Sequence, residues 1–200
     1  MKKLFVATSS NYKLAILKMV YKSIGTINHH SDEYINEQGS PKDESLRIAK
    51  DKVLSVDVSK IKKDVVIGID QVPYFNNTYI RKPLNKIKQM ELLTKFSGKT
   101  VDFYTAVYIK DFSNELTASH VDTTRVTFRK NSSNTIKQYV EIEDAIDCSG
   151  GFKIESLGSL IISKVASTDP FALQGVPLLW IVDQLSQFEI NPLNSLAEEV

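Results

Sequence analysis

The chain has 200 residues, of which 42% are hydrophobic and 24% charged, a composition that excludes a disordered or collagen-like protein. Its 25 basic and 24 acidic side chains nearly cancel, so we expect no nucleic-acid partner. The single cysteine, Cys148, excludes an internal disulfide and a cysteine-rich zinc site. No apolar run suits a signal-peptide core or a membrane span, which predicts a cytoplasmic α/β protein with no membrane partner.

Strand and helix signals alternate along the first half of the chain. The run Val65 to Ile69 is β-branched without alternation, which predicts a central strand covered on both faces. Ser40, followed by a proline, starts a helix whose buried stripe we expect to be Leu46, Ala49, Val53 and Val56. The other elements predicted here are a strand at 3–7, a helix capped within 8–11, and a hairpin that turns at Asn76–Asn77 and returns through 78–80.

Two long strands dominate the second half, 100–110 and 116–128, joined by a polar turn at 111–114. Around them we expect a helix from Asn85 to Gly98 with Ile87 on its inner face, a helix from Ser132 or Ser133 through Val140, a strand at 160–165, and a last helix repeating Leu178, Ile181, Leu185 and Phe188. The whole predicts one domain, residues 1–200, with an elongated mixed central sheet flanked by helices and a cleft at the strand carboxyl ends.

The first strand-to-helix junction is a candidate anion site. Ser9 and Ser10 are small enough for a phosphate to approach the free N–H groups of the helix start, and Lys13 on the first turn adds a cation. The same residues also suit an ordinary helix cap.

Asp70 is a second candidate because it directly follows five apolar strand residues, where α/β sheets commonly bind ligands. It is either a turn residue or a functional acid. Lys82 lies at the far end of the hairpin that Asp70 opens and can return beside it, although adjacent basic residues also suit a solvated edge.

Glu33 follows the first helix, and Lys52 sits at the boundary of the buried stripe on the second helix, where a lysine stem often only covers apolar surface. The three histidines show no metal-ligand spacing. The catalytic inventory is therefore carboxylates and lysines, and such hard oxygen ligands suit Mg²⁺ or Mn²⁺.

Together these segments resemble the Maf-like nucleoside triphosphate pyrophosphatases, nearly from end to end. The matching segments are 7–13, 32–33, 46–53, 66–72, 82–83, 97–98, 104–105, 147–155 and 169–178. The departures from the family pattern are Lys13 in place of arginine, and Arg81, Ala106, Ser149 and Ser156.

The resemblance implies a Maf/ITPase-like fold and hydrolysis between the α and β phosphates of a nucleotide, giving a monophosphate and pyrophosphate. It implies Asp70 as general base, a divalent cation held by Glu33 and Asp70, and a triphosphate held by Lys13, Lys52 and Lys82. It also suggests a homodimer.

The resemblance extends to the base of the nucleotide. The pair Asp70-Gln71 is similar to the subgroup that acts on 7-methyl-GTP, whereas a second subgroup has threonine after the aspartate and acts on UTP and dTTP. Tyr12 offers an aromatic face to a cationic base, and Glu155 can accept hydrogen bonds from guanine. Gln71 can both donate and accept. The alternatives are a UTP/dTTP or inosine-triphosphate pyrophosphatase, or a non-catalytic regulator of septum formation.

Overall fold

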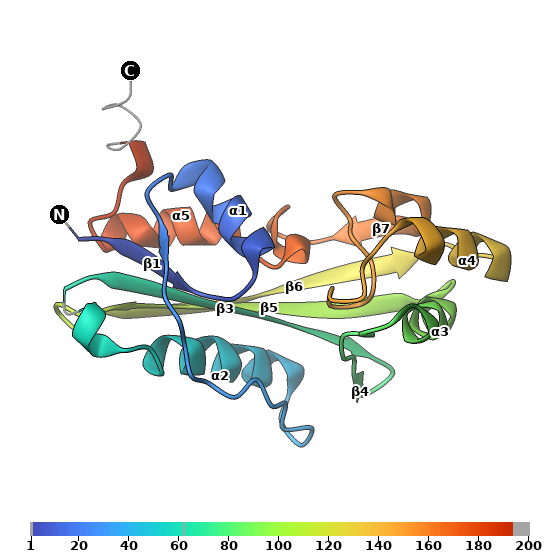
Figure 1. Ribbon diagram of the computed structural model, residues 1–200, viewed down its shortest axis with the longest axis horizontal. Helices are drawn as coiled ribbons and strands as arrows, with labels where there is room; N and C mark the ends of the chain where they lie inside the picture. The colour runs from blue at the N-terminus through green and yellow to red at the C-terminus, as the bar shows by residue number, and fades with distance from the viewer. Residues whose placement is uncertain (1, 62, 194–200) are drawn as a thin grey trace.

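The computed structural model describes residues 2–61 and 63–193, and within these residues seven strands form one sheet (Figure 1). The strand order is β2-β1-β3-β5-β6-β7, with β4 paired to β3. The strands are β1 Leu4–Ala7, β2 Gly25–Thr26, β3 Val65–Phe75, β4 Thr78–Tyr79, β5 Thr100–Asp111, β6 Thr117–Phe128 and β7 Ile162–Ala166. β1 runs parallel to β2 and β3, and the other pairings are antiparallel, so the expected mixed α/β sheet is confirmed.

Helices lie on both faces of this sheet. They are α1 Asn11–Val20, α2 Pro41–Leu54, α3 Lys86–Phe96, α4 Ser133–Ile142 and α5 Leu178–Gln187, with 3-10 turns η1 Val58–Lys60, η2 Leu157–Leu160 and η3 Ala172–Gln174. In Figure 1, α1 and α5 cover one face and α2 covers the other. No helix in the described part of the chain is long and apolar enough to cross a membrane.

A gap in the edge of β3 determines where a ligand can enter. β1 ends at Ala7, which lies opposite Gly68. β4 pairs only with the far end of β3, at Tyr74 and Phe75. Among the described residues, no strand therefore lies along this edge of β3 at 69–72. The opposite edge is paired with β5 without interruption, so β3 stays rigid across the gap.

Close packing of α2 on β3 fixes one wall beside this gap. A Cβ on Gly68 would lie 2.1 Å from the Ala49 carbonyl oxygen, so only glycine allows the helix to come this near. Because successive strand residues point to opposite faces, Asp70 shares the α2 face with Gly68, whereas Gln71 points to the face that carries α1 and α5.

The structure corrects four expectations about these elements. β3 does not end before Asp70 but continues to Phe75. Lys52 is not at the boundary of the α2 stripe: it is 4% exposed and lies on the buried face with Ile48 and Val53, while Leu46 is only half-buried. Ile87 on α3 is 69% exposed, and Gln89 takes the inner position instead. β7 starts only at Ile162, because 157–160 form η2. The remaining expected elements are confirmed to within a few residues.

Candidate active site

A cleft of about 730 Å³ opens at the gap in β3. All ten residues that the sequence singled out as candidates line it: Ser9, Ser10, Tyr12, Lys13, Glu33, Lys52, Asp70, Gln71, Lys82 and Glu155. The charged residues Arg81, Asp147 and Lys153 also line it, as do Cys148, Gln174 and Gly175. Because Asp70 and Gln71 point to opposite faces, the cleft extends around the edge of the sheet.

Lys52 lies at the centre of an ion-pair cluster on the α2 side. Its Nζ is 2.8 Å from Asp70 Oδ1 and 3.0 Å from Glu33 Oε1. Burial of the Lys52 ammonium would lower its pKa, but the carboxylates of Asp70 and Glu33 outweigh burial and raise it. Lys52 is therefore a fixed cation, not a lysine stem covering apolar surface.

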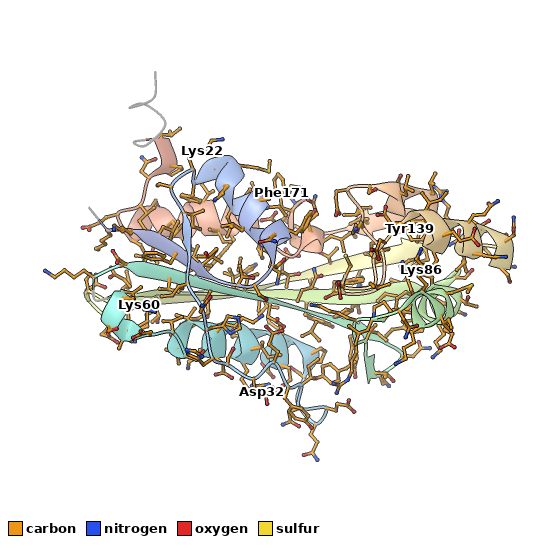
Figure 2. All side chains as sticks on the ribbon, viewed as in Figure 1. Lys22, Asp32, Lys60, Lys86, Tyr139 and Phe171 are labelled. Atoms are coloured by element: carbon orange, nitrogen blue, oxygen red, sulfur yellow. The ribbon has the colours of Figure 1, made fainter. Side chains whose placement is uncertain are left out.

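Glu33 reaches this cluster from the irregular segment between β2 and α2. Burial raises the pKa of its carboxyl, but the charge and hydrogen bond of Lys52 reverse the shift and lower it. Its neighbour Asp32 is not among the cleft residues, and its Oδ1 accepts a hydrogen bond from the Tyr34 N–H. Figure 2 shows Asp32 beyond α2, on the opposite side of the sheet from Phe171. Of the two adjacent acidic residues Asp32 and Glu33, only Glu33 lines the cleft.

The Ile69 carbonyl faces the gap in β3 and accepts hydrogen bonds from two lysines. Lys13 Nζ approaches it from α1 at 3.2 Å, and Lys52 Nζ approaches from α2 at 3.4 Å. The two helices lie on opposite faces of the sheet (Figure 1). Because both lysines reach the same carbonyl, their ammonium groups meet at the sheet edge. Burial of its ammonium lowers the pKa of Lys13 to about 8, and the neighbouring charge of Lys52 acts in the same direction. We call Lys13, Glu33, Lys52, Asp70 and Lys82 the acid–lysine group.

Lys82 completes this group from the segment that follows β4. The turn residues Asn76 and Asn77 have φ angles of 48° and 58°, which confirms the expected hairpin. Lys82 is exposed and lines the cleft with Lys13 and Asp70. Arg81 lies next to it at the cleft wall and forms an exposed ion pair of 3.2 Å with Glu37. The hairpin thus returns Lys82 to the site.

The first turn of α1 forms another part of the wall. Ser10 is the N-cap of α1, and its hydroxyl accepts a hydrogen bond from the Lys13 N–H at 3.4 Å. The cap interpretation of this segment therefore holds for Ser10, while Ser9 is exposed to the cleft. Since residues 8–13 all line the cleft, the positive end of the α1 dipole lies at its wall.

A second set of cleft residues gathers around Tyr12. We call Tyr12, Cys148, Glu155 and Gln174 the tyrosine group. The Tyr12 hydroxyl donates to Gln174 Oε1 at 2.8 Å. Burial, and then the negative charge of Glu155, raise the pKa of Tyr12. The segment that carries Cys148 and Glu155 turns through Gly150 and Gly151, with φ angles of 84° and 72°.

Gln71 differs from the expectation that it can both donate and accept toward a ligand. Its Nε2 donates to the carbonyls of Ala172 and Leu173, at 3.0 and 3.1 Å, and to Thr105 Oγ1 at 3.0 Å. Carbonyl oxygens accept only, so the side-chain NH₂ must face them. The amide donors are thus used within the protein, and only the Gln71 oxygen remains for a ligand.

The acid–lysine group fits a divalent cation only together with phosphate oxygens. The described residues contain no cluster of three or more His, Cys, Asp or Glu side chains suited to a metal. Mg²⁺, however, is commonly held by one or two carboxylates plus substrate phosphates and water. Glu33 and Asp70 are two carboxylates that converge on one nitrogen, so they meet that requirement.

Two contributions to the site were missed by the sequence reasoning. The Ile69 carbonyl is a backbone group, and no residue type signals its role. Gln174 lies within the matched segment 169–178 but has no chemistry of its own that would single it out. Its link to Tyr12 spans 162 positions of the chain.

The described residues thus form an α/β fold with a cleft of lysines and carboxylates at a break in the sheet edge. A family model described as "Maf-like protein" matches residues 3–188. The chain therefore belongs to the Maf-like family.

The chain is also similar to individual members. It is 35% identical over 189 residues to a protein of Pseudoalteromonas atlantica named 7-methyl-GTP pyrophosphatase, covering 94% of this chain and 96% of that protein. Proteins of the same name from Vibrio vulnificus and Colwellia psychrerythraea are both 32% identical, covering 92% and 96% of this chain and 94% and 96% of their own lengths. Among solved structures, Staphylococcus aureus Ham1 aligns with a TM-score of 0.41 at 13% identity, over 78% of this chain and 90% of that one.

Proposed function

We propose that the protein is a nucleoside triphosphate pyrophosphatase that cleaves the α–β phosphate bond and prefers 7-methyl-GTP. The observation that carries this proposal is the buried Lys52 ammonium between Asp70 and Glu33, beside Lys13 and the N-terminus of α1. Phosphoryl transfer depends on positioning and on charge neutralisation more than on covalent chemistry. The group offers both, and the relatives named 7-methyl-GTP pyrophosphatase support the assignment.

Asp70 is the proposed general base. Lys52 binds Asp70 Oδ1, which fixes the carboxylate on a paired strand and leaves the second oxygen to accept a proton from the attacking water. Asp70 is only 9% exposed, and its side chain opens to the cleft. A base held in this way needs no rearrangement when the nucleotide binds.

The remaining charges hold the triphosphate. We assign phosphate oxygens to Lys13, Lys82 and the first-turn N–H groups of α1. The other cations that line the cleft, Lys52, Arg81 and Lys153, each pair with a carboxylate. Glu33 and Asp70 would hold Mg²⁺ or Mn²⁺. When bound, such an ion neutralises phosphate charge and lowers the pKa of a bound water.

The tyrosine group is the proposed binding site for the nucleobase. Methylation at N7 makes guanine cationic, and a cation is attracted to an aromatic face by about 0.5–2 kcal/mol. Tyr12 is 39% exposed, so its ring is accessible from the cleft. Glu155 can accept from the guanine N1–H and amino group, which uracil and thymine do not offer together. Gln71 contributes at most an acceptor, since its donors bind the protein.

Pyrophosphate release measured with 7-methyl-GTP, GTP, UTP, dTTP and ITP tests the proposal. We expect the highest kcat/KM with 7-methyl-GTP and turnover that requires Mg²⁺ or Mn²⁺. A higher kcat/KM with UTP or dTTP, or with ITP, would reassign the base site to one of the alternative substrates. Absence of turnover with all five would favour the non-catalytic regulator. A cytoplasmic location stays a prediction of the sequence, and a homodimer stays a prediction of the resemblance.

A further inference from the structure

The η3 turn is bound to the sheet through side chains of two neighbouring strands. The Ala172 carbonyl accepts from Gln71 Nε2 at 3.0 Å and from Thr105 Oγ1 at 2.9 Å. Gln71 Nε2 also donates to the Leu173 carbonyl at 3.1 Å. Gln71 and Thr105 are opposite each other in the β3–β5 pairing, and Thr105 is 0% exposed. These bonds add to the turn's own backbone bonds, among them the Gly175 N–H to the Ala172 carbonyl at 2.9 Å.

The same turn contacts the first turn of α1 at two points. Gln174 accepts from the Tyr12 hydroxyl at 2.8 Å. Gly175, which ends the turn with a φ of 84°, lies against the stem of Lys13: a Cβ on Gly175 would be 3.1 Å from Lys13 Cε. Any residue but glycine would be strained here and would press on Lys13. One short turn thus contacts both the Tyr12 hydroxyl and the stem of Lys13.

The far side of the turn is also anchored. Asp169 Oδ1 accepts from the Phe171 N–H at 2.9 Å, and its Oδ2 accepts from the Leu179 N–H at 2.7 Å. The turn is therefore fixed to α5 on one side and to the sheet on the other. On the sheet side the turn is held by Gln71, which also lines the cleft, and by the buried Thr105.

We propose that Gln71, Thr105 and Gln174 are positioning residues, which hold η3 so that it sets the location of Tyr12 and Lys13 in the cleft. Gln71 then influences the choice of nucleotide through the turn and not by donating to the base. The substrate named in this inference rests on the proposed function, whereas the mechanical link from β5 to α1 does not.

Thr105→Val tests the sheet side of the link, with Thr105→Ser as its rescue. Valine keeps the shape and the strand preference of threonine but lacks the hydroxyl that binds Gln71 and Ala172. We expect Thr105→Val to raise KM for 7-methyl-GTP about tenfold with kcat changed less than about threefold. Thr105→Ser should stay within about twofold of the wild type. Thr127→Val on β6 is the control: this threonine is half-buried, and within the described part of the chain its hydroxyl bonds only to Thr100, at 3.1 Å.

The outcomes separate positioning from a general loss of stability. Thr127→Val should leave KM unchanged even where it lowers the unfolding midpoint. An unchanged KM in Thr105→Val, or an equal loss in Thr105→Ser, would overturn the inference.

A double-mutant cycle between Gln174→Met and Tyr12→Phe tests the α1 side. Each variant removes one partner of the same hydrogen bond. We expect each to raise KM about threefold and the double variant to show no further increase. Independent, multiplying effects would show that the turn does not act through Tyr12.

Hydrogen exchange gives a readout that does not need turnover. The Leu14 N–H donates to the Ser10 carbonyl in the first turn of α1. We expect this amide to exchange at least about fivefold faster in Thr105→Val than in Thr105→Ser. If the wild type hydrolyses no nucleotide, the proposed function fails, but this comparison still tests the link. Equal exchange in the two variants would refute it.

Discussion

Three of the five residues in the acid–lysine group are carried by helices and a strand, whereas three of the four residues in the tyrosine group are carried by loops and a short turn. Lys13, Lys52 and Asp70 come from α1, α2 and β3. Lys52 forms ion pairs with Asp70 at 2.8 Å and with Glu33 at 3.0 Å. Glu155 follows a glycine turn, and Gln174 is in η3. The contrast teaches that the residues proposed for bond cleavage are held mainly by the sheet and its helices. The residues proposed to select the nucleobase lie mainly in loops, which can change without disturbing the sheet.

Asp70→Asn should produce the largest effect, a loss of turnover without a change in nucleotide preference. The amide keeps the shape of the side chain but cannot take a proton from water or pair as a charge with Lys52. We expect kcat for 7-methyl-GTP to fall at least about 100-fold while the preference among nucleotides persists. Asp102→Asn on β5, which loses only a partly exposed pair with Arg125, is the control for pyrophosphate release. Comparable turnover in Asp70→Asn and the wild type would remove Asp70 from the mechanism.

Glu155→Gln should change only the preference among nucleobases. Glutamine replaces one carboxylate acceptor by a donor, which opposes the N1–H and amino group of guanine. We expect kcat/KM for 7-methyl-GTP to fall about tenfold and the value for UTP to change less than about twofold. Glu141→Gln, an exposed change on α4, is the control. An equal loss with both nucleotides would mean that Glu155 belongs with the phosphate contacts.

The pH dependence of KM should reveal a smaller effect at Lys13. Burial lowers the pKa of this lysine to about 8, so its ammonium loses charge as the pH rises through that value. We expect KM to rise about threefold between pH 7 and pH 9, and to stay flat in Lys13→Arg, because a guanidinium remains charged. A parallel rise in Lys13→Arg would assign the titration to another group.

The same shift has the opposite sign for stability. Between about pH 8 and the ordinary lysine pKa of 10.5, the unfolded chain binds more protons at Lys13 than the folded chain does. The Lys13 contribution to the free energy of unfolding therefore increases with pH across this window. Thermal unfolding of the wild type and Lys13→Arg at pH 7 and pH 9.5 measures it.

Much of the fold is predictable because its signals are local. Ser10, Ser40 and Asn85 cap the three helices that their sequence contexts predict. The ten candidate residues converge because strand–helix junctions and a hairpin bring them to one place. What they do together is a proposal that the experiments above test.

The failures have tertiary causes. β3 continues past Asp70 although Pro73 follows. Proline lacks an N–H, but at Pro73 that position faces the β4 edge and not β5, so no hydrogen bond to β5 is lost. The Pro73 carbonyl faces the same edge and accepts from the Ile80 N–H. Lys52 is buried because Asp70 and Glu33 compensate its charge, and neither is near it in sequence. The donors of Gln71 are used by carbonyls 101 and 102 residues away.

The break in the β3 edge also bears on aggregation. An unpaired strand edge is a template for another chain, and proteins commonly protect such edges with charged side chains, lysine above all. Here Lys13 and Lys52 occupy the Ile69 carbonyl, the position at which an incoming strand would begin to pair. Lys13, which we assign to nucleotide phosphates, and Lys52, which pairs with Asp70 and Glu33, therefore also protect this strand edge. A variant that lacks both lysines would leave the edge of β3 open to pairing with another chain and would also lose the cleft charges.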